Sequence, residues 1–437
     1  MTPGGRIKRQ LSDLKRWTND WIVFWLLLSL LALAGCGFQE NQSGTLNELD
    51  SITALTTTDI WAVGFASTGQ GARPLVEQWN GRTWGTVPTP DVGKISALSG
   101  VAALTATDVW AVGRIDQGRA GYTTLIENWD GHAWKVIPSP NSPGSNDLRG
   151  VAVVSASDVW AVGETIPCYS PPALAASQQS NALARVRLAG SGSACEESPP
   201  PPPQPLIEHW DGSAWSIVPS PPLDPNTNQA LLNKVVAFAP DNIWAAGFIL
   251  TNHATTPGGG LLVEHWEGTA WQVVTGFDHG LRAETLAFLS STNIWGVKDN
   301  SSSQKGYPPP TIQHWNGSVW SVVADPQKVS APNYGIETLA ASGPNDVWAI
   351  GGYYYSSSLP SPADHVFTMH WDGSVWRQVP CPSADGAGGD ITASASLAPN
   401  DAWLVGEYSQ SSSVQLIFMK HWDGHAWRVV PIPNPGT

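Results

Sequence analysis

Short apolar stretches separated by turn residues recur along the chain from about residue 46 onward. In the segment 100–138, "GVAAL" is followed by the turn "TATD" and then by "VWAVGR", "TTLIENW" and "AWKVIP". Stretches of five to seven residues suit strands, and no long part of the chain has apolar residues at the 3.6-residue period of a helix. This pattern predicts an all-β unit of four short antiparallel strands.

The last two strands of this unit are joined by a hairpin signal. Asp130-Gly131 favours a two-residue type I′ turn, and the other copies have Asn-Gly, Asp-Gly or Glu-Gly there. Such a turn would place Trp129 opposite His132 and Glu127 opposite Trp134. Alternation along the strands would then put both tryptophans on one face as a diagonal pair.

The four-strand unit is repeated seven times. One half of the repeat is "DVWAVG", which begins in variant forms at Asp59, Asp108, Asp158, Asn242, Asn293, Asp346 and Asp401. The other half is "HWDGxxW", whose tryptophan pairs are 79/84, 129/134, 210/215, 266/271, 315/320, 371/376 and 422/427. The tryptophans of the first half are spaced by 49, 50, 84, 51, 53 and 55 residues, and the long spacing contains an insertion.

Seven four-stranded repeats of about 50 residues predict a seven-bladed β-propeller. Three tryptophans per copy account for 21 of the 24 in the chain, and the simplest role for them is packing between blades. An alternative is that they form seven platforms for stacking sugars, as in lectin propellers.

The two half-motifs also resemble the repeat of secreted bacterial β-propellers grouped with the kelch and Asp-box types, over about residues 46–433. The chain departs from kelch because a Gly-Gly pair in the second strand occurs only at Gly351-Gly352. It departs from the Asp-box because "S-x-D-x-G-x-x-W" is not found. The resemblance therefore implies a fold and carries over no active site.

The repeats define a propeller domain at 46–437, after a signal peptide at 1–35 and a tether at 36–45. The blades are expected at about 46–90, 97–140, 148–221, 231–275, 281–324, 334–382 and 390–433, with an insertion at 166–205 in blade three. Blade one begins with its own inner strand ("DSITAL") and blade seven ends with its own outer strand ("AWRVVP"). We therefore expect the ring to close without a swapped strand.

The first 36 residues have the pattern of a secretory signal. Five basic residues precede the apolar run "WIVFWLLLSLLALA" at 21–34. The run ends in "LAGC", which resembles a bacterial lipobox and implies cleavage before Cys36 and acylation of that residue. The alternative is an uncleaved membrane anchor, but the run is shorter than the ~20 residues that span a bilayer. The expected location is extracytoplasmic, with the protein lipid-anchored to the membrane through Cys36.

Charge narrows the range of partners. After residue 35 the chain has 17 basic and 34 acidic side chains, a net charge near −17. Such a chain repels phosphate backbones, so we expect no nucleic-acid partner. The expected partners are an envelope protein or a glycan, and the expected state is a monomer.

Most candidate chemistry belongs to the repeat. His209, His265, His314, His370 and His421 occupy one repeated position, which indicates a structural role rather than a metal site. The aspartates that open "DVWAVG" suit a turn. No metal-ligand cluster, P-loop, dinucleotide fingerprint or G-x-S-x-G motif in a fitting context occurs, so we expect no metal and no cofactor.

Charges that break the repeat gather where the first strands begin, at the predicted mouth of the central channel. The candidate ligand-binding residues there are Glu48, Asp50, Arg149, Lys234, Arg282, Glu284, Glu337 and Asp390. The alternative is that they are scattered solvated charges. If the protein is an enzyme, Glu284 and Glu337 are the expected catalytic carboxylates, since a glycosidase requires two at close range.

Variable loops on the same face add further candidates. Tyr353, Tyr354 and Tyr355 form an aromatic, polar loop in blade six that suits sugar or protein contact. Cys168 and Cys195 in the insertion could form a disulfide, which leaves Cys381 unpaired in this scheme.

Two functions follow from these patterns. The first is a non-catalytic, lipid-anchored propeller that binds a protein or a glycan through its loop-rich face. The second is an extracytoplasmic glycan hydrolase or lyase with carboxylates at the channel mouth. We favour binding because every strong motif is architectural. A metal-radical oxidase has less support, because Cys381 and the tyrosines show no recognisable pairing.

Overall fold

A computed structural model describes residues 45–68, 71–93, 95–167, 202–251, 259–277, 280–298, 310–324, 334–353, 366–382, 389–411 and 414–436. These residues form strands β1 to β28 and one short 3-10 helix, η1 (Gly118–Ala120). The fold is all-β, as the sequence predicts. No helix in the described part of the chain is both long and apolar enough to cross a membrane. The signal and lipobox, 1–36, lie outside the described residues.

Each blade has four strands in sequence order. Blades one to three contain β1 (Thr45–Thr56), β2 (Asp59–Thr68), β3 (Gly71–Trp79), β4 (Trp84–Thr86), β5 (Ser96–Thr105), β6 (Asp108–Asp116), β7 (Tyr122–Trp129), β8 (Trp134–Val136), β9 (Gly144–Ser155), β10 (Asp158–Pro167), β11 (Gln204–Trp210) and β12 (Trp215–Ile217). Blades four and five contain β13 (Thr227–Ala239), β14 (Asn242–Thr251), β15 (Gly260–Trp266), β16 (Trp271–Val273), β17 (Leu281–Ser290), β18 (Asn293–Lys298), β19 (Thr311–Trp315) and β20 (Trp320–Ala324). Blades six and seven contain β21 (Tyr334–Gly343), β22 (Asp346–Tyr353), β23 (Val366–Trp371), β24 (Trp376–Gln378), β25 (Asp390–Ala398), β26 (Asp401–Ser411), β27 (Val414–Trp422) and β28 (Trp427–Val430).

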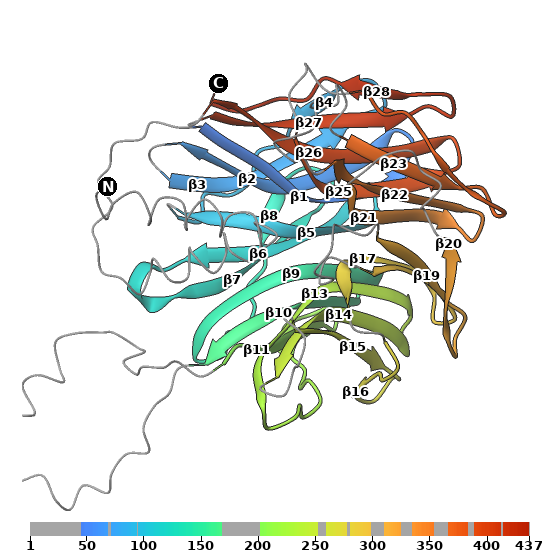
Figure 1. Cartoon of the computed structure of the whole chain (residues 1–437). Coiled ribbons are helices and arrows are strands. Elements are labelled where there is room, and N and C mark those ends of the chain that lie inside the picture. Colours follow the sequence, from blue (N-terminus) through green and yellow to red (C-terminus); the bar gives the residue numbers. More distant parts are fainter. Residues whose placement is uncertain are drawn as a thin grey trace, which may run out of the picture. The chain divides into compact units, whose positions relative to one another are not determined.

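The first strand of every blade is the innermost one. Each first strand contacts the first strand of the next blade, and β25 of blade seven contacts β1, so the series closes on itself (Figure 1). The loops between second and third strands lie on one face, and the tight turns between first and second strands lie on the other. The first strands therefore surround a central channel with a loop-rich end and a turn-rich end.

Blades one and seven join through a short parallel contact. Thr45 and Leu46 of β1 pair with Val414 and Gln415 of β27, which merges the two blades into one sheet. Blade seven nevertheless has its own outer strand, because β28 pairs with β27. Similar contacts occur at other junctions, where Ala72 bridges to Ile95 and the Ala230 amide donates to the Pro203 carbonyl. The closing junction is thus of the same kind as other junctions in the ring.

Tryptophans pack between blades in a repeated arrangement. Trp61 of blade one is fully buried, and its ring centroid lies 5.3 Å from Trp129 and 5.6 Å from Trp134 of blade two. Trp403 of blade seven contacts the Trp79/Trp84 pair of blade one in the same way and closes the ring. Equivalent contacts join Trp110 to Trp210/Trp215, Trp160 to Trp266/Trp271, Trp295 to Trp371/Trp376 and Trp348 to Trp422/Trp427.

The junction of blades four and five departs from this arrangement. Phe277 lies between Trp244 and the Trp315/Trp320 pair, with centroid distances of 6.5 Å to Trp244 and 5.4 Å to each ring of the pair. An additional aromatic ring thus fills the space that the direct tryptophan contact fills elsewhere.

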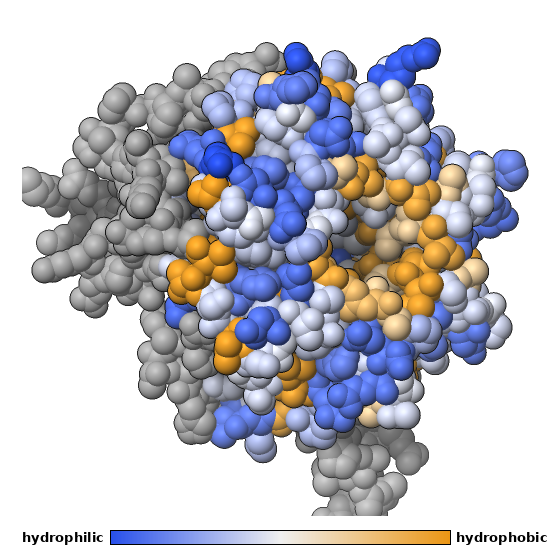
Figure 2. Space-filling model, turned by 90° about the vertical axis from the view of Figure 1, so that its right-hand side faces the viewer, coloured by the Kyte–Doolittle hydropathy of each residue, from blue (hydrophilic) through white to orange (hydrophobic). Residues whose placement is uncertain are grey.

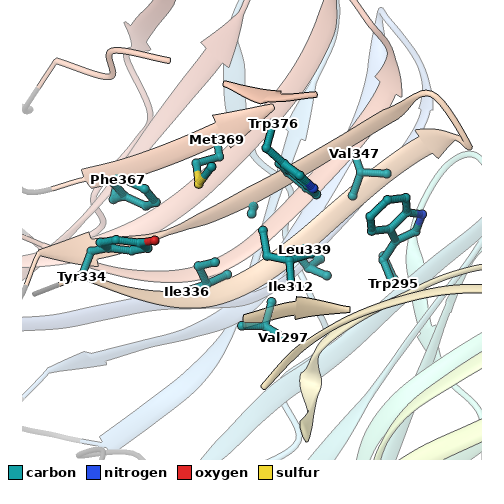
Figure 3. Close-up of a cluster of buried hydrophobic side chains, with 12 residues drawn as sticks. Trp295, Val297, Ile312, Tyr334, Ile336, Leu339, Val347, Phe367, Met369 and Trp376 are labelled. Carbon is teal, nitrogen blue, oxygen red and sulfur yellow. The ribbon is translucent and has the colours of Figure 1, made fainter. Parts of the chain in front are cut away.

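Aliphatic and aromatic side chains extend each blade interface toward the loop-rich face. Figure 3 shows the interface of blades five and six, where Trp295 and Trp376 lie near one end and Tyr334 and Phe367 lie at the other. The Tyr334 and Phe367 rings stack with centroids 4.0 Å apart. The core is therefore divided into seven clusters of buried side chains.

The prediction for the outer hairpin is wrong in register. Trp129 pairs directly with Trp134, and Glu127 pairs with Val136, so the loop has four residues rather than two. The Asp130 carboxylate accepts the amides of His132 and Ala133, each at 3.0 Å, and Gly131 has a φ of +91°. These side-chain hydrogen bonds stabilise the longer loop. The two tryptophans are therefore directly opposite, not diagonal.

The repeated histidines have the structural role that their spacing suggests. Nε2 of His209 lies 2.9 Å from Asp158, and Nε2 of His370 lies beside Asp346 at 2.6 Å. The His209 ring also stacks on Trp160, with centroids 4.3 Å apart. The turn itself is closed by a hydroxyl two residues earlier, since the Ser157 amide donates to the Ser155 hydroxyl at 3.3 Å. The aspartate thus orients the ring side chains instead of forming the turn.

Four blades bury a glutamate in the third strand: Glu77, Glu127, Glu208 and Glu264, all 0% exposed. Across a blade interface, the Ser220 hydroxyl donates to Glu264 at 2.8 Å. Burial raises the pKa of Glu77 and Glu264 to about 7 and that of Glu127 and Glu208 to about 8. At neutral pH these side chains are substantially protonated.

Blade seven has a lysine at the glutamate position. Lys420 is fully buried; its ammonium group donates to the Pro382 carbonyl and lies 3.6 Å from the Cys381 sulfur. Cys381 occupies the serine position of the preceding blade, so a lysine and a cysteine replace the Glu–Ser pair at this interface.

We expect Trp61→Ala to lower the free energy of unfolding by about 3–5 kcal/mol, because it empties a fully buried site between two blades. Urea denaturation followed by circular dichroism measures the change. The control is Val375→Ala, at a side chain that is 42% exposed. An equal, small effect for both variants would contradict the packing role of Trp61.

A double-mutant cycle tests the exchanged pair at blades six and seven. Lys420→Glu should destabilise the chain because the new carboxylate faces a carbonyl group, while Lys420→Glu with Cys381→Ser recreates the pair found at Ser220 and Glu264. We expect a favourable coupling of about 1–2 kcal/mol in urea denaturation. Additive effects would show that the two positions act independently.

The buried glutamates predict that stability falls as pH rises. The folded pKa of Glu127 is about 8, above its ordinary value of 4.5. Between about pH 4.5 and 8 the folded chain therefore keeps a proton that the unfolded chain has already released, and stability falls as pH rises. Thermal unfolding across this range should show a falling midpoint. Glu127→Gln should reduce the free energy of unfolding that is lost across this range by on the order of a few kcal/mol. Glu267→Gln, at an exposed carboxylate, should leave that loss unchanged.

Candidate functional site: the charged mouth of the channel

Every first strand contains a β-bulge near the loop-rich end. In blade one, Leu49 pairs with Gly64 and Ser51 pairs with Val63, which leaves Asp50 out of the ladder. The register shifts at the same place in the other blades. A bulge redirects the extra side chain. We call the residues at this position the bulge ring: Asp50, Ser99, Arg149, Asn233, Glu284, Glu337 and Thr392.

The repeated glycine of "DVWAVG" permits the bulge. A Cβ at Gly163 would collide with the backbone carbonyl oxygen of Asp147, and one at Gly406 would collide with that of Asp390. Only glycine allows the second strand to approach the bulged first strand this closely. In the six blades that have this glycine, the motif that carries the fold is thus also the motif that places one polar side chain at the channel.

A second bulge in each first strand lies near the turn-rich end. Its residues are mostly apolar, and all but the exposed Ser342 are half-buried: Leu55, Leu104, Val154, Phe238, Leu289, Ser342 and Leu397. Figure 2 shows the turn-rich face, where a hollow opens with a largely hydrophobic wall. The two ends of the channel therefore differ in chemistry, with polar side chains at the loop-rich end and apolar side chains at the other.

The eight charged residues singled out from sequence lie on the first strands near the polar end. Asp50, Arg149, Glu284 and Glu337 belong to the bulge ring. Glu48, Arg282 and Asp390 precede them by two residues at one repeated position, and Lys234 follows the ring position of blade four. The side chain of Tyr353 is not described, and Tyr354, Tyr355, Cys168 and Cys195 lie outside the described residues. Within the described ranges, Cys381 is buried and forms no disulfide.

Arginines on blades two and three form ion pairs at the mouth. Arg114 contacts Asp147 at 2.9 Å, and Arg149 contacts Glu164 at 2.5 Å and Asp147 at 3.5 Å. The Arg149 guanidinium is half-buried, and the two carboxylates raise its pKa against the opposite effect of burial. This side of the mouth is charge-compensated.

Blade four continues the compensated side. Glu284 accepts a hydrogen bond from Asn233 at 2.6 Å, and the Lys234 ammonium donates to the Leu286 carbonyl at 2.5 Å. Burial lowers the pKa of Lys234 to about 8, against the opposing field of Glu284. Glu284 is thus associated with Lys234 and Arg149.

The other side of the mouth, on blades six, seven and one, is rich in carboxyl groups. We call it the acidic arc: Glu48, Asp50, Glu337, Asp390 and Glu407. Asp390 and Glu407 are directly opposed on adjacent strands, and Glu337 accepts the Ile391 amide at 3.0 Å. Glu48 and Asp50 are hydrogen-bonded to each other.

The acidic arc holds protons that separate carboxyl groups would release. Burial, reinforced by Asp390, raises the pKa of Glu337 to about 8 and that of Glu407 to about 7. Burial also raises the pKa of Asp50 to about 6. For Glu48, burial and then the charges of Asp50 and Glu407 raise the pKa well above its ordinary value.

Four mouth residues were not singled out from sequence, three of them on second strands. Arg114, Glu164 and Glu407 follow the repeated glycine of the second strand, where other blades have Phe65, Phe248 or Gly352. A charged residue at a position that is apolar or glycine in other blades could have identified them, but the search for such departures covered the first strands alone. Asp147 lies on a first strand and was missed although it occupies the Glu48 position of blade three.

The described residues contain no group of three or more histidine, cysteine, aspartate or glutamate side chains placed to hold a metal ion. The charges that act on Glu337 come from Asp390 and Arg282, whereas Glu284 acts on Arg149 and Lys234. Glu337 therefore has its closest electrostatic partner in Asp390. The pairing of Glu284 with Glu337 remains a prediction.

No protein-family model and no curated protein matches the chain. Among solved structures it is similar to a GH74 xyloglucanase from Xanthomonas campestris, with 14% identity, coverage of 89% of this chain and 54% of that one, and a TM-score of 0.53. It is also similar to an acylaminoacyl peptidase from Pyrococcus horikoshii (10% identity, coverage of 90% and 53%, TM-score 0.51). The β-propeller domain of the Trilobed protease from Pyrococcus furiosus is a further similar structure (9%, 90% and 100%, 0.49).

These likenesses concern the fold. The chain spans about half the length of the xyloglucanase and of the peptidase. A glycan-cleaving enzyme and a peptidase are both among the similar structures, and one architecture supports many activities.

Proposed function

We propose that this protein is a non-catalytic, lipid-anchored β-propeller outside the cytoplasm, which binds a protein or a glycan at the loop-rich end of its channel. The bulge ring is the observation that carries this proposal. It supplies one polar or charged side chain from each of seven blades around one opening, and the rest of the repeat serves packing. Convergent polar groups in a concave opening are typical of ligand sites.

The lipid anchor rests on the basic residues, apolar run and "LAGC" of the first 36 residues. A tether of about nine residues, 37–45, reaches at most ~30 Å. It enters β1, which begins at the loop-rich end, so the binding face and the anchor share one end of the blade. This favours a partner in the cell envelope over a soluble polymer.

A glycan hydrolase or lyase is the second candidate, and one observation favours it. Glu337 holds a proton at neutral pH beside Asp390, which is the combination of an acid and a nearby carboxylate that glycoside hydrolysis uses. The enzyme hypothesis would therefore assign the acid role to Glu337 and the second role to Asp390, in place of Glu284.

A combined screen separates the two functions. The full-length protein in nonionic detergent is exposed to peptide and envelope-glycan arrays, and both bound ligand and released product are measured. We expect binding without product, weakened about tenfold or more by Asp50→Asn combined with Asp390→Asn. Glu267→Gln, on an exposed hairpin at the other face, is the control and should bind as the unchanged protein does.

Product release would overturn the binding proposal if Glu337→Gln abolished it and ligand capture persisted. Binding that is unaffected by the double variant would place the site elsewhere on the molecule. No binding and no product across both arrays would contradict both functions.

A further inference from the structure

We propose that blades seven and one form a peptide-docking site, which takes an extended Asn-Pro-Gly segment. Residues 434–436 occupy this site within the chain. The receiving residues are Thr45 and Asn47 of β1 and Ile417 of β27. Because the segment is not joined to blade one, a separate peptide of the same kind can bind in its place. This inference goes beyond the proposed function and does not depend on a ligand at the channel mouth.

The Asn434 side chain extends the ladder of the blade-seven sheet. Its Oδ1 accepts the Ile417 amide at 2.8 Å, and its Nδ2 donates to the Ile417 carbonyl at 3.1 Å. The pairing of β27 with β28 ends at Met419 and Val430, so Ile417 lies beyond the last strand pair. The side-chain amide therefore satisfies a strand backbone that would otherwise need another partner.

Two residues of β1 hold the rest of the segment. Asn47 donates from Nδ2 to the Pro435 carbonyl at 3.2 Å, and the same Nδ2 lies 3.4 Å from Oδ1 of Asn434. The Thr45 hydroxyl donates to the Gly436 carbonyl at 3.0 Å. Asn47 is fully buried, and Asn434 and Pro435 are half-buried. These contacts span 387 to 391 positions of the sequence, so they join the first blade to the last.

The same contact occurs where a covalent linker joins blades two and three. Oδ1 of Asn141 in that linker accepts the Thr124 amide at 2.9 Å. Thr124 and Ile417 occupy one repeated position, since each precedes the residue that pairs with the repeated glycine. Asn141 and Asn434 therefore have the same role, and residues 434–436 take the place of an interblade linker.

A buried asparagine of the first strand receives the linker at both junctions. Asn146 and Asn47 are each fully buried, and each lies two residues before the leucine that pairs with the repeated glycine. Nδ2 of Asn146 donates to the Ser142 carbonyl at 2.8 Å. This matches the donation from Asn47 to Pro435. The linker of blades two and three continues into β9, whereas residues 434–436 have no covalent link to β1, so docking replaces a covalent connection where the ring closes.

An unpartnered oxygen shows that the present occupant does not use the site fully. Oδ1 of Asn146 accepts the Ser142 amide at 3.2 Å. The corresponding residue of the docked segment is Pro435, which has no amide hydrogen. The buried Oδ1 of Asn47 consequently has no hydrogen-bond partner among the described residues. Since an unsatisfied buried acceptor weakens the contact, a segment with an amide at this position should bind more tightly.

Release of the segment would loosen one end of the closing junction. Apart from this segment, β1 and β27 pair through residues 45–46 and 414–415. Two such pairs at strand ends open readily when no neighbouring contact covers them. Hydrogen exchange of residues 45–47 and 414–417 therefore reports whether the site is occupied.

The first experiment compares two asparagines by hydrogen exchange of the full-length protein in nonionic detergent. Asn434→Ala should speed exchange of residues 45–47 and 414–417 about tenfold, because the segment leaves blade one. Asn141→Ala is the matched control. It should speed exchange at Thr124 but leave the first residues of β9 unchanged, because its linker is covalently attached. Unchanged exchange at residues 45–47 in the Asn434→Ala variant would overturn the inference.

The second experiment supplies the segment as a separate peptide. A variant that lacks residues 432–437 should lose the protection at residues 45–47 and 414–417. The peptide acetyl-IPNPGT contains the missing residues, including Ile432, which packs on the apolar cluster of blades seven and one. It should restore protection at about 1–10 mM, the range of effective concentration that a chain connection provides.

Two altered peptides identify the contacts. The peptide with Asn434→Ala should restore no protection, because it cannot pair with Ile417. The peptide with Pro435→Ser should bind about fivefold more tightly than the unchanged one. Its new amide can donate to Asn47, and this gain exceeds the loss of the rigidity that proline gives.

Each result bears on the inference separately. If no peptide restores protection to the folded, shortened variant, the segment acts only as part of its own chain and the docking site is wrong. If the Pro435→Ser peptide binds no better than the unchanged one, Asn47 is not the receiving residue. If the shortened variant does not fold, Pro435→Ser in the full-length protein provides the test. Slower exchange at residues 45–47 would support the site, and unchanged or faster exchange would contradict it.

Discussion

The ring depends on the contact of one tryptophan with a pair of tryptophans on the next blade. Trp61 packs on Trp129 and Trp134, and Trp403 packs on Trp79 and Trp84 to close the circle. A four-stranded blade has two apolar faces and cannot bury both by itself, so each blade depends on its neighbours for most of its core. Packing of large rings between adjoining blades gives the fold a strong driving force that does not involve the channel.

Since packing involves the residues of the blade faces, the bulged positions of the innermost strands are free to vary. The glycine of "DVWAVG" allows a bulge in the first strand, and this bulge directs one side chain out of the ladder. Blade five lacks a glycine at this position and has Lys298, and its pairing between the first two strands is interrupted over Leu281 to Leu286. The same short motif therefore determines both the blade packing and the geometry of the channel mouth.

The fold was predictable from sequence because its signals are repeated. Seven copies of two motifs fix the number of blades and the order of the strands, and the structure has both. The hairpin register was not predictable from Asp130-Gly131 alone, since the Asp130 side chain closes a four-residue loop that competes with the two-residue turn. The replacement of the Glu–Ser pair by Lys420 and Cys381 was not predictable for another reason. The two residues belong to different blades, and the sequence does not show that they are in contact.

The channel mouth was only half predictable. Departures from the repeat on the first strands identified Asp50, Glu337 and Asp390, since these strands are recognisably innermost. Glu407 and Arg114 belong to second strands, which the sequence assigns to blade packing, and they reach the mouth because each lies one residue beyond the repeated glycine. Which charges meet is decided by the order of the blades around the ring, and that order brings blade seven next to blade one across the whole length of the chain.

The two sides of the channel mouth differ in how their charges are compensated. On blades two to four, arginine and lysine side chains compensate the carboxylates, and this side needs no ligand. On blades six, seven and one, neighbouring carboxyl groups hold protons above their ordinary pKa values, an arrangement that costs folding free energy as pH rises. The tryptophan packing can offset that cost, so the acidic arc can persist although its five carboxyl groups outnumber the arginines that act on them, Arg114, Arg149 and Arg282. A region that is unfavourable for folding and borders an open channel is where a bound partner can lower the free energy of the folded chain the most.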